Sequence, residues 1–115
     1  MKFLIIDEDP KMCKLIKEEV CSNEDNIIEY TNSENPVNMY VKHLPDFVLI
    51  DIQMNTLNGI DITRKICERF PMARVIGLSE DNAPMFRLAT LRSGAIAFFP
   101  KEDLIKVKEF ISRSK

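Results

Sequence analysis

Four short apolar runs end in residues that could do chemistry, and the residue types complement one another. Carboxylates follow the first run at 7–9 (Asp-Glu-Asp) and the third run at Asp51, a hydroxyl follows the fourth at Ser79, and an amine follows the fifth at Lys101. Clustered carboxylates raise one another's pKa unless a cation neutralises them. Mg²⁺, which takes few carboxylates and keeps several waters, suits a shallow rim better than Ca²⁺ does. A hydroxyl and an ammonium at the same spot would bind phosphoryl oxygens, so the set indicates phosphoryl transfer with a carboxylate as nucleophile.

The elements that must position these residues follow from a hydrophobic pattern that switches between two periods. Five short runs rich in β-branched and aromatic residues are typical of strands covered on both faces, and they lie at 3–6, 27–30, 47–50, 75–78 and 95–99. Apolar residues at three- and four-residue steps predict helices between and after them. Asp9 is the predicted cap of the first helix, with Pro10 in its first turn, and Ser33 is the predicted cap of a second that runs to His43. The other helices are predicted around 62–70, 82–92 and 104–111.

This alternation of strands and helices predicts an α/β fold in which a parallel sheet lies between two layers of helices. In open parallel sheets, ligands bind outside the carboxyl ends of the strands. The polar residues at the ends of the apolar runs are therefore expected to meet at one edge of the sheet.

Length and composition exclude several classes of protein. The chain has 115 residues, is 45% hydrophobic and 30% charged, and carries a net charge of −2. We expect a single domain over residues 1–115, and the absence of a basic excess argues against a dedicated nucleic-acid binder. No apolar run approaches the roughly 20 residues that span a bilayer, and no secretory signal is evident, so a cytoplasmic location is expected. Cys13, Cys21 and Cys67 form no Cys-x-x-Cys pair, which indicates reduced thiols.

Over essentially its whole length, the sequence resembles the receiver domain of two-component response regulators. The matching motifs are Asp7-Glu8, Asp51, Ser79 and Lys101, each after an apolar run. The resemblance implies a three-layer flavodoxin-like (βα)5 sandwich, doubly wound, whose five-stranded parallel sheet has the order 2-1-3-4-5. It also implies that Asp51 is the phosphoacceptor of a phosphorelay, taking its phosphoryl group from a phosphohistidine on a histidine kinase or a histidine phosphotransfer protein.

The same resemblance implies roles for the residues around the acceptor. The implied ligands of Mg²⁺, with Mn²⁺ as an alternative ion, are three carboxylates and one backbone carbonyl: Asp7, Glu8, Asp51 and the carbonyl of Gln53. Lys101 would pair with the phosphoryl group, Ser79 would hydrogen-bond it, and Phe98 matches the aromatic residue that moves with that hydroxyl. The residues implied to tune the lifetime of the phosphoryl group are Gln53, Glu80 and Asp81.

The resemblance further implies how the signal leaves the domain. The readout surface would comprise the fourth helix, the fifth strand and the fifth helix, and it would bind an output protein or a fused effector domain outside this chain. A homodimer that forms on phosphorylation is a further expected arrangement. The domain itself would catalyse only its own phosphorylation and dephosphorylation, and would bind neither nucleic acid nor membrane.

The sequence departs from the usual receiver pattern in three places. Asn55 stands where a proline is common, four residues after the acceptor. Pro100 precedes Lys101, whereas receivers often place a proline directly after the lysine, and here Glu102 follows. Glu80 replaces the small residue that usually follows the hydroxyl position, and a bulky acid there predicts slow phosphorylation by a dianionic donor.

Three alternative readings remain. The first is a receiver-like interaction module that is never phosphorylated. The second is a Mg²⁺-dependent phosphatase, because Asp7-Glu8-Asp9 also resembles the Asp-x-Asp motif of haloacid-dehalogenase-type enzymes, with Asp7 as nucleophile and Asp9 as acid/base. Against it, Lys11 stands where Thr or Val is expected, and Asp51 would have no role. The third is that the chain is part of a longer DNA-binding regulator.

Overall fold

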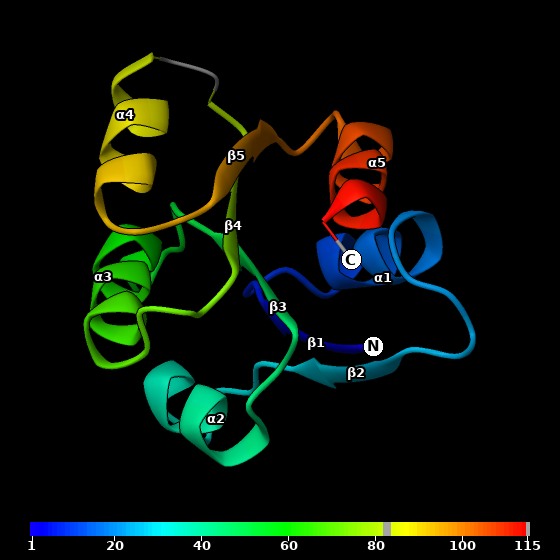
Figure 1. The fold of residues 1–115 in the computed structure, drawn as a ribbon, viewed down its shortest axis with the longest axis horizontal. Helices are drawn as coiled ribbons and strands as arrows, with labels where there is room; N and C mark the ends of the chain where they lie inside the picture. Colours follow the sequence, from blue (N-terminus) through cyan, green and yellow to red (C-terminus); the bar gives the residue numbers. More distant parts are fainter. Residues whose placement is uncertain (82–83, 115) are drawn as a thin grey trace.

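The computed structural model describes residues 1–81 and 84–114, which form five strands alternating with five helices (Figure 1). The strands are β1 (Lys2–Ile6), β2 (Asn26–Glu29), β3 (Phe47–Asp51), β4 (Val75–Ser79) and β5 (Ala97–Pro100). The helices are α1 (Pro10–Glu19), α2 (Pro36–His43), α3 (Gly59–Arg69), α4 (Pro84–Arg92) and α5 (Leu104–Arg113). The predicted start of the fourth helix, at 82–83, lies outside the described residues. None of the helices within those ranges is both long and apolar enough to cross a bilayer.

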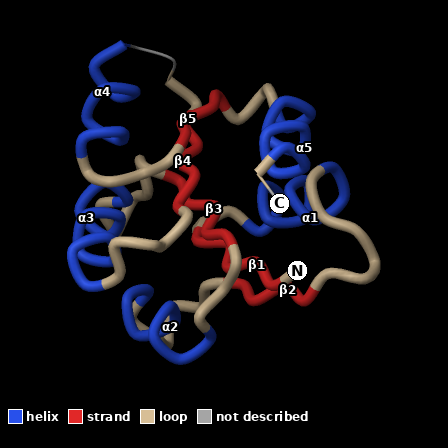
Figure 2. The backbone as a smooth tube through the Cα atoms, in the orientation of Figure 1, coloured by secondary structure: helices blue, strands red, loops and turns tan. Residues whose placement is uncertain are grey.

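The strands form one parallel sheet in the order β2-β1-β3-β4-β5, which confirms the flavodoxin-like topology. Figure 2 shows the sheet as a middle layer, with α1 and α5 on one side and α2, α3 and α4 on the other. The register aligns Ile6 with Ile50, Asp51 with Leu78, and Ser79 with Pro100. The polar residues that follow β1, β3, β4 and β5 therefore emerge at one edge of the sheet.

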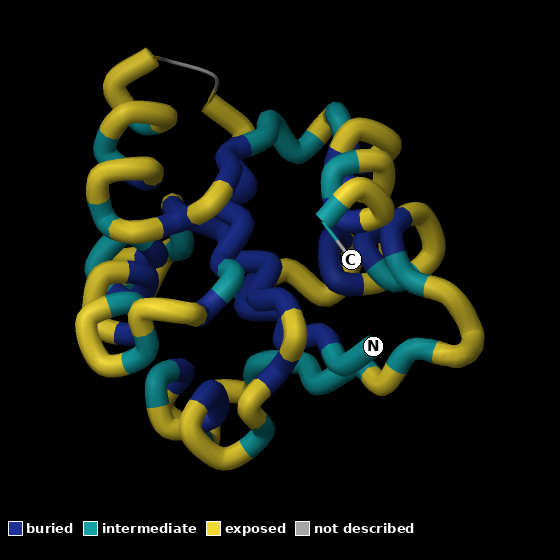
Figure 3. The backbone as a smooth tube through the Cα atoms, in the orientation of Figure 1, coloured by how far each residue is buried: buried dark blue, intermediate teal, exposed yellow. Residues whose placement is uncertain are grey.

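Side chains from both faces of the central strands are buried, which explains why these strands read as unbroken apolar runs. Phe3 and Ile5 of β1 pack in a core with α1 and α5, whereas Leu4 and Ile6 pack in a second core with α2 and α3. All five residues of β3 and all five of β4 are buried. Figure 3 shows this buried backbone running through the middle of the molecule. The sheet is therefore a rigid base for the loops at its edge.

The structure confirms one predicted helix cap and corrects another. Asp9 caps α1 as predicted, and its carboxylate accepts a hydrogen bond of 3.0 Å from the backbone N–H of Lys11. The cap of α2 is Asn35 and not Ser33, because Asn35 Oδ1 accepts hydrogen bonds from the two N–H groups of Val37 and Asn38. Ser33 lies in the preceding turn. The amide side chain next to Pro36 is the better-placed acceptor, since proline fits the first helical position.

The end of β5 also differs from the sequence prediction. The strand covers Ala97–Pro100 and not 95–99, so Pro100 is its last residue. Because β5 pairs only with β4, it is an edge strand, where a proline is tolerated. All peptide bonds in the described ranges are trans, including the one before Pro100.

Helix α4 docks on the sheet through a close contact with Gly77 of β4, and not through a broad apolar face. Thr90 is the one residue of α4 that is fully buried, whereas Met85 and Leu88 are exposed. A Cβ atom at Gly77 would lie 2.5 Å from Cγ2 of Thr90 and 3.2 Å from Cγ2 of Ile52. The absent side chain of Gly77 therefore leaves the space that the Thr90 methyl group fills. This close approach explains why a poorly patterned helix still docks on the sheet.

We expect Gly77→Ala to destabilise the fold by about 2 kcal/mol, because the added methyl group overpacks this contact. Thr90→Ser keeps the hydroxyl group and removes the clashing methyl, so it should recover part of the loss in the double variant. The free energies of unfolding in urea of the two single variants and the double variant measure this coupling. A double variant no more stable than Gly77→Ala would contradict the proposed contact.

Candidate functional site

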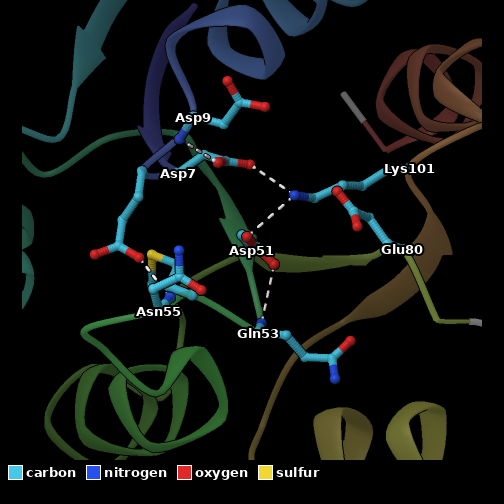
Figure 4. Close-up of a pocket in the computed structure, with 9 residues that line it drawn as sticks. Asp7, Asp9, Asp51, Gln53, Asn55, Glu80 and Lys101 are labelled. Atoms are coloured by element: carbon cyan, nitrogen blue, oxygen red, sulfur yellow. Dashed lines mark hydrogen bonds and ion pairs between the residues drawn. The ribbon is translucent and has the colours of Figure 1, made fainter.

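A pocket of about 400 Å³ opens at the carboxyl edge of the sheet, where the loops after β1, β3, β4 and β5 meet (Figure 4). Its charged lining consists of five acids and one base: Asp7, Glu8, Asp9, Asp51, Glu80 and Lys101. The excess of carboxylates over ammonium groups makes the pocket strongly negative. The sequence prediction that the polar strand ends gather at one edge is confirmed.

The ammonium of Lys101 lies between two carboxylates at the centre of this pocket (Figure 4). Its Nζ is 3.1 Å from Oδ2 of Asp7 and 3.0 Å from Oδ2 of Asp51, and all three side chains are at most 10% exposed. Burial works to lower the pKa of Lys101, but the hydrogen bonds and charges of Asp51 and Asp7 raise it above its usual value. The lysine is held in place because its backbone N–H also donates to the carbonyl of Ser79 at 2.8 Å.

Asp7 is the most deeply buried of these carboxylates, and one of its oxygens is poorly satisfied. Its Oδ1 accepts a hydrogen bond of 2.9 Å from the backbone N–H of Asp9. Its Oδ2 is buried and accepts no well-directed hydrogen bond from the described residues, although Lys101 is close enough for an ion pair. Burial raises the pKa of Asp7 above its usual value. A buried carboxylate oxygen that shares a single ammonium with a second carboxylate fits a divalent cation with oxygen ligands.

Asp51 is the more accessible partner of Lys101, and its surroundings hold it firmly. Its side chain is 10% exposed, against 2% for Asp7, and its Oδ1 accepts a hydrogen bond of 2.9 Å from the backbone N–H of Gln53. Helix α3 begins directly against it, because a Cβ atom at Gly59 would lie 2.2 Å from the backbone oxygen of Asp51. Asp51 thus presents a fixed carboxylate at the floor of the pocket.

The hydroxyl of Ser79 is fully buried and already engaged. It donates to Oε1 of Gln53 at 2.9 Å and accepts a hydrogen bond of 3.0 Å from the backbone N–H of Asp81. Figure 4 shows the Gln53 side chain directed away from the ion pairs of Lys101. Any ligand of Ser79 in the pocket must therefore compete with Gln53 for the hydroxyl proton.

Glu8 is the predicted metal ligand that the structure does not bring to the other two carboxylates. Its Oε1 accepts hydrogen bonds from the backbone N–H groups of Asn55 at 2.6 Å and Thr56 at 3.2 Å, and its Oε2 accepts one from the Thr56 hydroxyl. These bonds, the one from the Thr56 hydroxyl foremost, hold the pKa of Glu8 below its usual value. In the described part of the chain, no three acidic, histidine or cysteine side chains are grouped to hold a metal ion.

Thr56 and the backbone of Asn55 are the site residues that sequence reasoning missed. The departure at Asn55 contained the signal, because a proline there would have no N–H to offer to a carboxylate. Thr56 carries no comparable signal, since a polar residue in a turn is ordinary.

The remaining predicted residues lie around the pocket. Phe98 is 3% exposed, pairs with Gly77 across β4 and β5, and accepts a hydrogen bond of 3.5 Å on its backbone oxygen from Arg87 of α4. Glu80 is exposed and lines the rim. Asp81 lies beside it, with its backbone N–H on Ser79.

A doubly wound parallel sheet with acids and a lysine at its carboxyl edge defines an α/β domain of the flavodoxin-like class. The model of the response regulator receiver domain family matches residues 3–112, and the chain belongs to this family. The expected resemblance to receivers of two-component systems is confirmed. The domain is a signalling module, and in some relatives an enzyme activity is named for the larger protein that carries such a domain.

Relatives with related sequences include proteins that the match covers almost fully and proteins that it covers only in part. The chain is 29% identical to the chemotaxis protein CheY of Thermotoga maritima over 101 residues, which are 87% of this chain and 84% of that protein. It is 34% identical over 71 residues to the transcriptional regulatory protein DegU of Brevibacillus brevis, which are 62% of this chain and 30% of that protein. A protein-glutamate methylesterase/protein-glutamine glutaminase of Pyrococcus horikoshii is 30% identical over 105 residues, 88% of this chain and 28% of that protein. The chain thus spans about a third of DegU and of the methylesterase.

Solved structures show the same fold. The BeF3-activated N-terminal receiver domain of Klebsiella pneumoniae RstA has a TM-score of 0.85 at 18% identity, covering 99% of this chain and 97% of that one. A CheY-like receiver domain protein from Methanospirillum hungatei has a TM-score of 0.84 at 19% identity, covering 98% and 91%.

We expect Asp7→Asn to stabilise the metal-free protein at neutral pH by on the order of 1 kcal/mol. Because burial raises the pKa of Asp7 in the folded state, the folded chain binds this proton more readily than the unfolded chain does. The negative charge therefore costs stability at neutral pH, and the gain in Asp7→Asn should shrink as the pH falls through the folded pKa toward 3.8, the usual value. Urea unfolding in EDTA across this pH range measures the effect.

Asp103→Asn is the matched control, because the half-buried side chain of Asp103 lies at the start of α5, outside the acidic pocket, and forms an ion pair with Lys106 at 3.7 Å. Its unfolding free energy should differ little from that of the wild-type chain. A loss of stability in Asp7→Asn at neutral pH would instead show that pairing with Lys101 outweighs the cost of burying the charge.

Proposed function

We propose that this receiver domain accepts a phosphoryl group on Asp51 and changes its binding surface in response. The single observation that carries the proposal is the position of Asp51: its carboxylate lies at the floor of the acidic pocket, 3.0 Å from the ammonium of Lys101 and partly open to solvent. Asp7, the nucleophile of the phosphatase alternative, is a weaker candidate than Asp51 because its side chain is only 2% exposed.

In the proposed reaction, an oxygen of the Asp51 carboxylate attacks phosphorus, and the bond between phosphorus and the donor nitrogen of a phosphohistidine breaks. The electron pair of that bond stays with the imidazole, and the product is an acyl phosphate on Asp51. Lys101, already beside the nucleophile, would pair with the phosphoryl oxygens, and Ser79 would donate to them after leaving Gln53. This self-phosphorylation and the hydrolysis of the acyl phosphate, in which water takes the phosphoryl group and the Asp51 carboxylate is regenerated, are the only reactions proposed for the domain.

The metal ion proposed for this site is Mg²⁺, with Mn²⁺ as an alternative. The residues that would hold it are Asp7, Glu8 and Asp51, with the backbone carbonyl of Gln53. When bound, the ion would neutralise the excess negative charge that otherwise opposes an incoming phosphoryl dianion. The poorly satisfied buried oxygen of Asp7 supports this assignment.

The proposed output is a change on the surface formed by α4, β5 and α5. Transfer of the Ser79 hydroxyl from Gln53 to the phosphoryl group would alter the packing around Phe98, whose backbone oxygen is bonded to Arg87 of α4. A pocket of about 510 Å³ lies between these elements, and its lining includes Arg87, Phe99 and Phe110. A few charge-assisted contacts supply the 1–3 kcal/mol that is typical of allosteric coupling.

The proposed partners are a histidine kinase or histidine phosphotransfer protein as donor, and an output protein or fused effector domain as receiver of the signal. We further propose a homodimer on phosphorylation and a cytoplasmic location. DegU is named as a transcriptional regulatory protein, which illustrates how a longer relative uses such a domain. The alternative, an unphosphorylated interaction module, is favoured by the acidic rim at Glu80 and by the altered loops at Asn55 and Pro100.

We expect one phosphoryl adduct when the protein is incubated with Mg²⁺ and acetyl phosphate. It should be stable in acid and labile in base, as an acyl phosphate is, and it should be absent in Asp51→Asn. Intact-mass spectrometry measures it. An adduct that persists in Asp51→Asn but is lost in Asp7→Asn would support the phosphatase alternative, and no adduct with any donor would support the unphosphorylated module.

We expect Glu80→Gln to accelerate phosphorylation by acetyl phosphate about threefold at low salt, because it removes a negative charge from the rim that the dianionic donor approaches. The initial rate of adduct formation at several salt concentrations measures the effect, which should shrink as salt rises. Glu102→Gln is the matched control, because Glu102 is exposed beside Lys101 but does not line the pocket. Equal acceleration in both variants would show that net charge, and not the rim, sets the rate.

A further inference from the structure

We propose that the tip of the β3–α3 loop is a latch that holds Glu8 away from the cation site, so that Mg²⁺ binding must release this loop. Thr56 and the backbone of Asn55 are then positioning residues for a metal ligand. This inference rests on the metal site of the proposed function. It adds that Mg²⁺ binding costs the free energy needed to release the loop.

The latch consists of three hydrogen bonds from the loop to the Glu8 carboxylate. Both carboxylate oxygens are engaged: one by the two backbone N–H groups of Asn55 and Thr56, the other by the Thr56 hydroxyl. Hydrogen bonds to a charged acceptor are among the stronger ones in proteins. In Figure 4, Asn55 lies across the pocket from Lys101, so these bonds hold Glu8 away from the ion pairs of Lys101.

A divalent ion beside Asp7 and Asp51 would compete for the same carboxylate. In the proposed latch, Glu8 would turn an oxygen toward such an ion by giving up hydrogen bonds from the loop. The two other carboxylates are already adjacent, since both contact the ammonium of Lys101. Glu8 is therefore the one carboxylate of the proposed metal site that would have to move to join the other two.

The loop is built so that its tip can move while its base stays fixed. An antiparallel bridge joins Gln53 to Asn58, and it closes a tip of residues 54–57. Below the bridge, the backbone N–H of Ile52 donates to the carbonyl of Leu78 at 3.0 Å, and Gln53 donates to Asp51. Release of Glu8 would thus free Asn55 and Thr56 without moving the acceptor.

The latch depends on the residue at position 55, where Asn stands in place of the proline that is common in receivers. A proline there could not donate to Glu8, because its nitrogen carries no hydrogen. The N–H of Asn55 supplies the shorter of the two backbone bonds, at 2.6 Å. The affinity for Mg²⁺ is therefore lowered by the population in which the loop holds Glu8, and weakening the latch should raise it.

The test is a Mg²⁺ titration of the ¹⁵N-labelled chain without a phosphodonor, followed by the amide resonances. In the wild-type chain, the amides of Asn55 and Thr56 should shift together with those of Asp7 and Asp51, with one dissociation constant. Thr56→Val removes the hydroxyl donor and should tighten Mg²⁺ binding about fivefold. Thr31→Val is the matched control, because the hydroxyl of Thr31 lies in an exposed loop and bonds to Ser33. It should leave the affinity unchanged.

Asn55→Pro, which removes a backbone donor, gives an independent check and should also tighten binding. The latch would be overturned if the resonances of Asp7 and Asp51 shifted saturably while those of Asn55 and Thr56 did not, and if Thr56→Val bound Mg²⁺ no more tightly than the wild-type chain. That outcome would leave the proposed function intact. The absence of any saturable shift in all variants would overturn both the latch and the metal site.

Discussion

The structure of the site depends on one interaction, the ammonium of Lys101 between the carboxylates of Asp7 and Asp51. Two buried negative charges next to each other would repel strongly in a medium of low dielectric constant. A single positive charge bridges them, and the raised pKa of Lys101 shows that the bridge outweighs the burial of the lysine. The compensation is incomplete, because two charges face one and the pKa of Asp7 is raised. The site therefore keeps an excess of negative charge in the folded chain.

The fold makes this bridge possible by bringing together residues that are far apart in the chain. Asp7 follows β1, Asp51 ends β3 and Lys101 follows β5, and these strands run in the same direction in one sheet. Their buried side chains on both faces fix the strand positions. Helix α3 reaches close to Asp51 because Gly59 has no side chain, and α4 reaches the sheet because Gly77 has none. The positions of a few glycines thus set how closely the helices approach the site.

Much of this arrangement could be predicted from the sequence, because it follows from strand order and direction alone. The strand-end rule places Asp7, Asp51 and Lys101 at one edge without any knowledge of side-chain conformation. Hydrogen-bond partners could not be predicted in this way. Ser33 and Asn35 are both good helix caps by residue type, and only the path of the turn decides between them. Glu8 was expected beside the other acids, but its flexible side chain follows the nearest donors, which the loop at 55–56 supplies.

The hydrogen-bond partners of the site residues also determine which existing contacts a ligand would have to displace. Lys101 is already in contact with Asp51, so the phosphoryl group proposed for that carboxylate would meet the ammonium directly. In the proposed function Ser79 would leave Gln53, and in the proposed latch Glu8 would leave three donors on the loop. A ligand can shift a conformational equilibrium only by the difference between the contacts that it makes in the two states. If Ser79 and Glu8 respond as proposed, the hydrogen bonds that now hold them set how much free energy a phosphoryl group or a cation would have to supply.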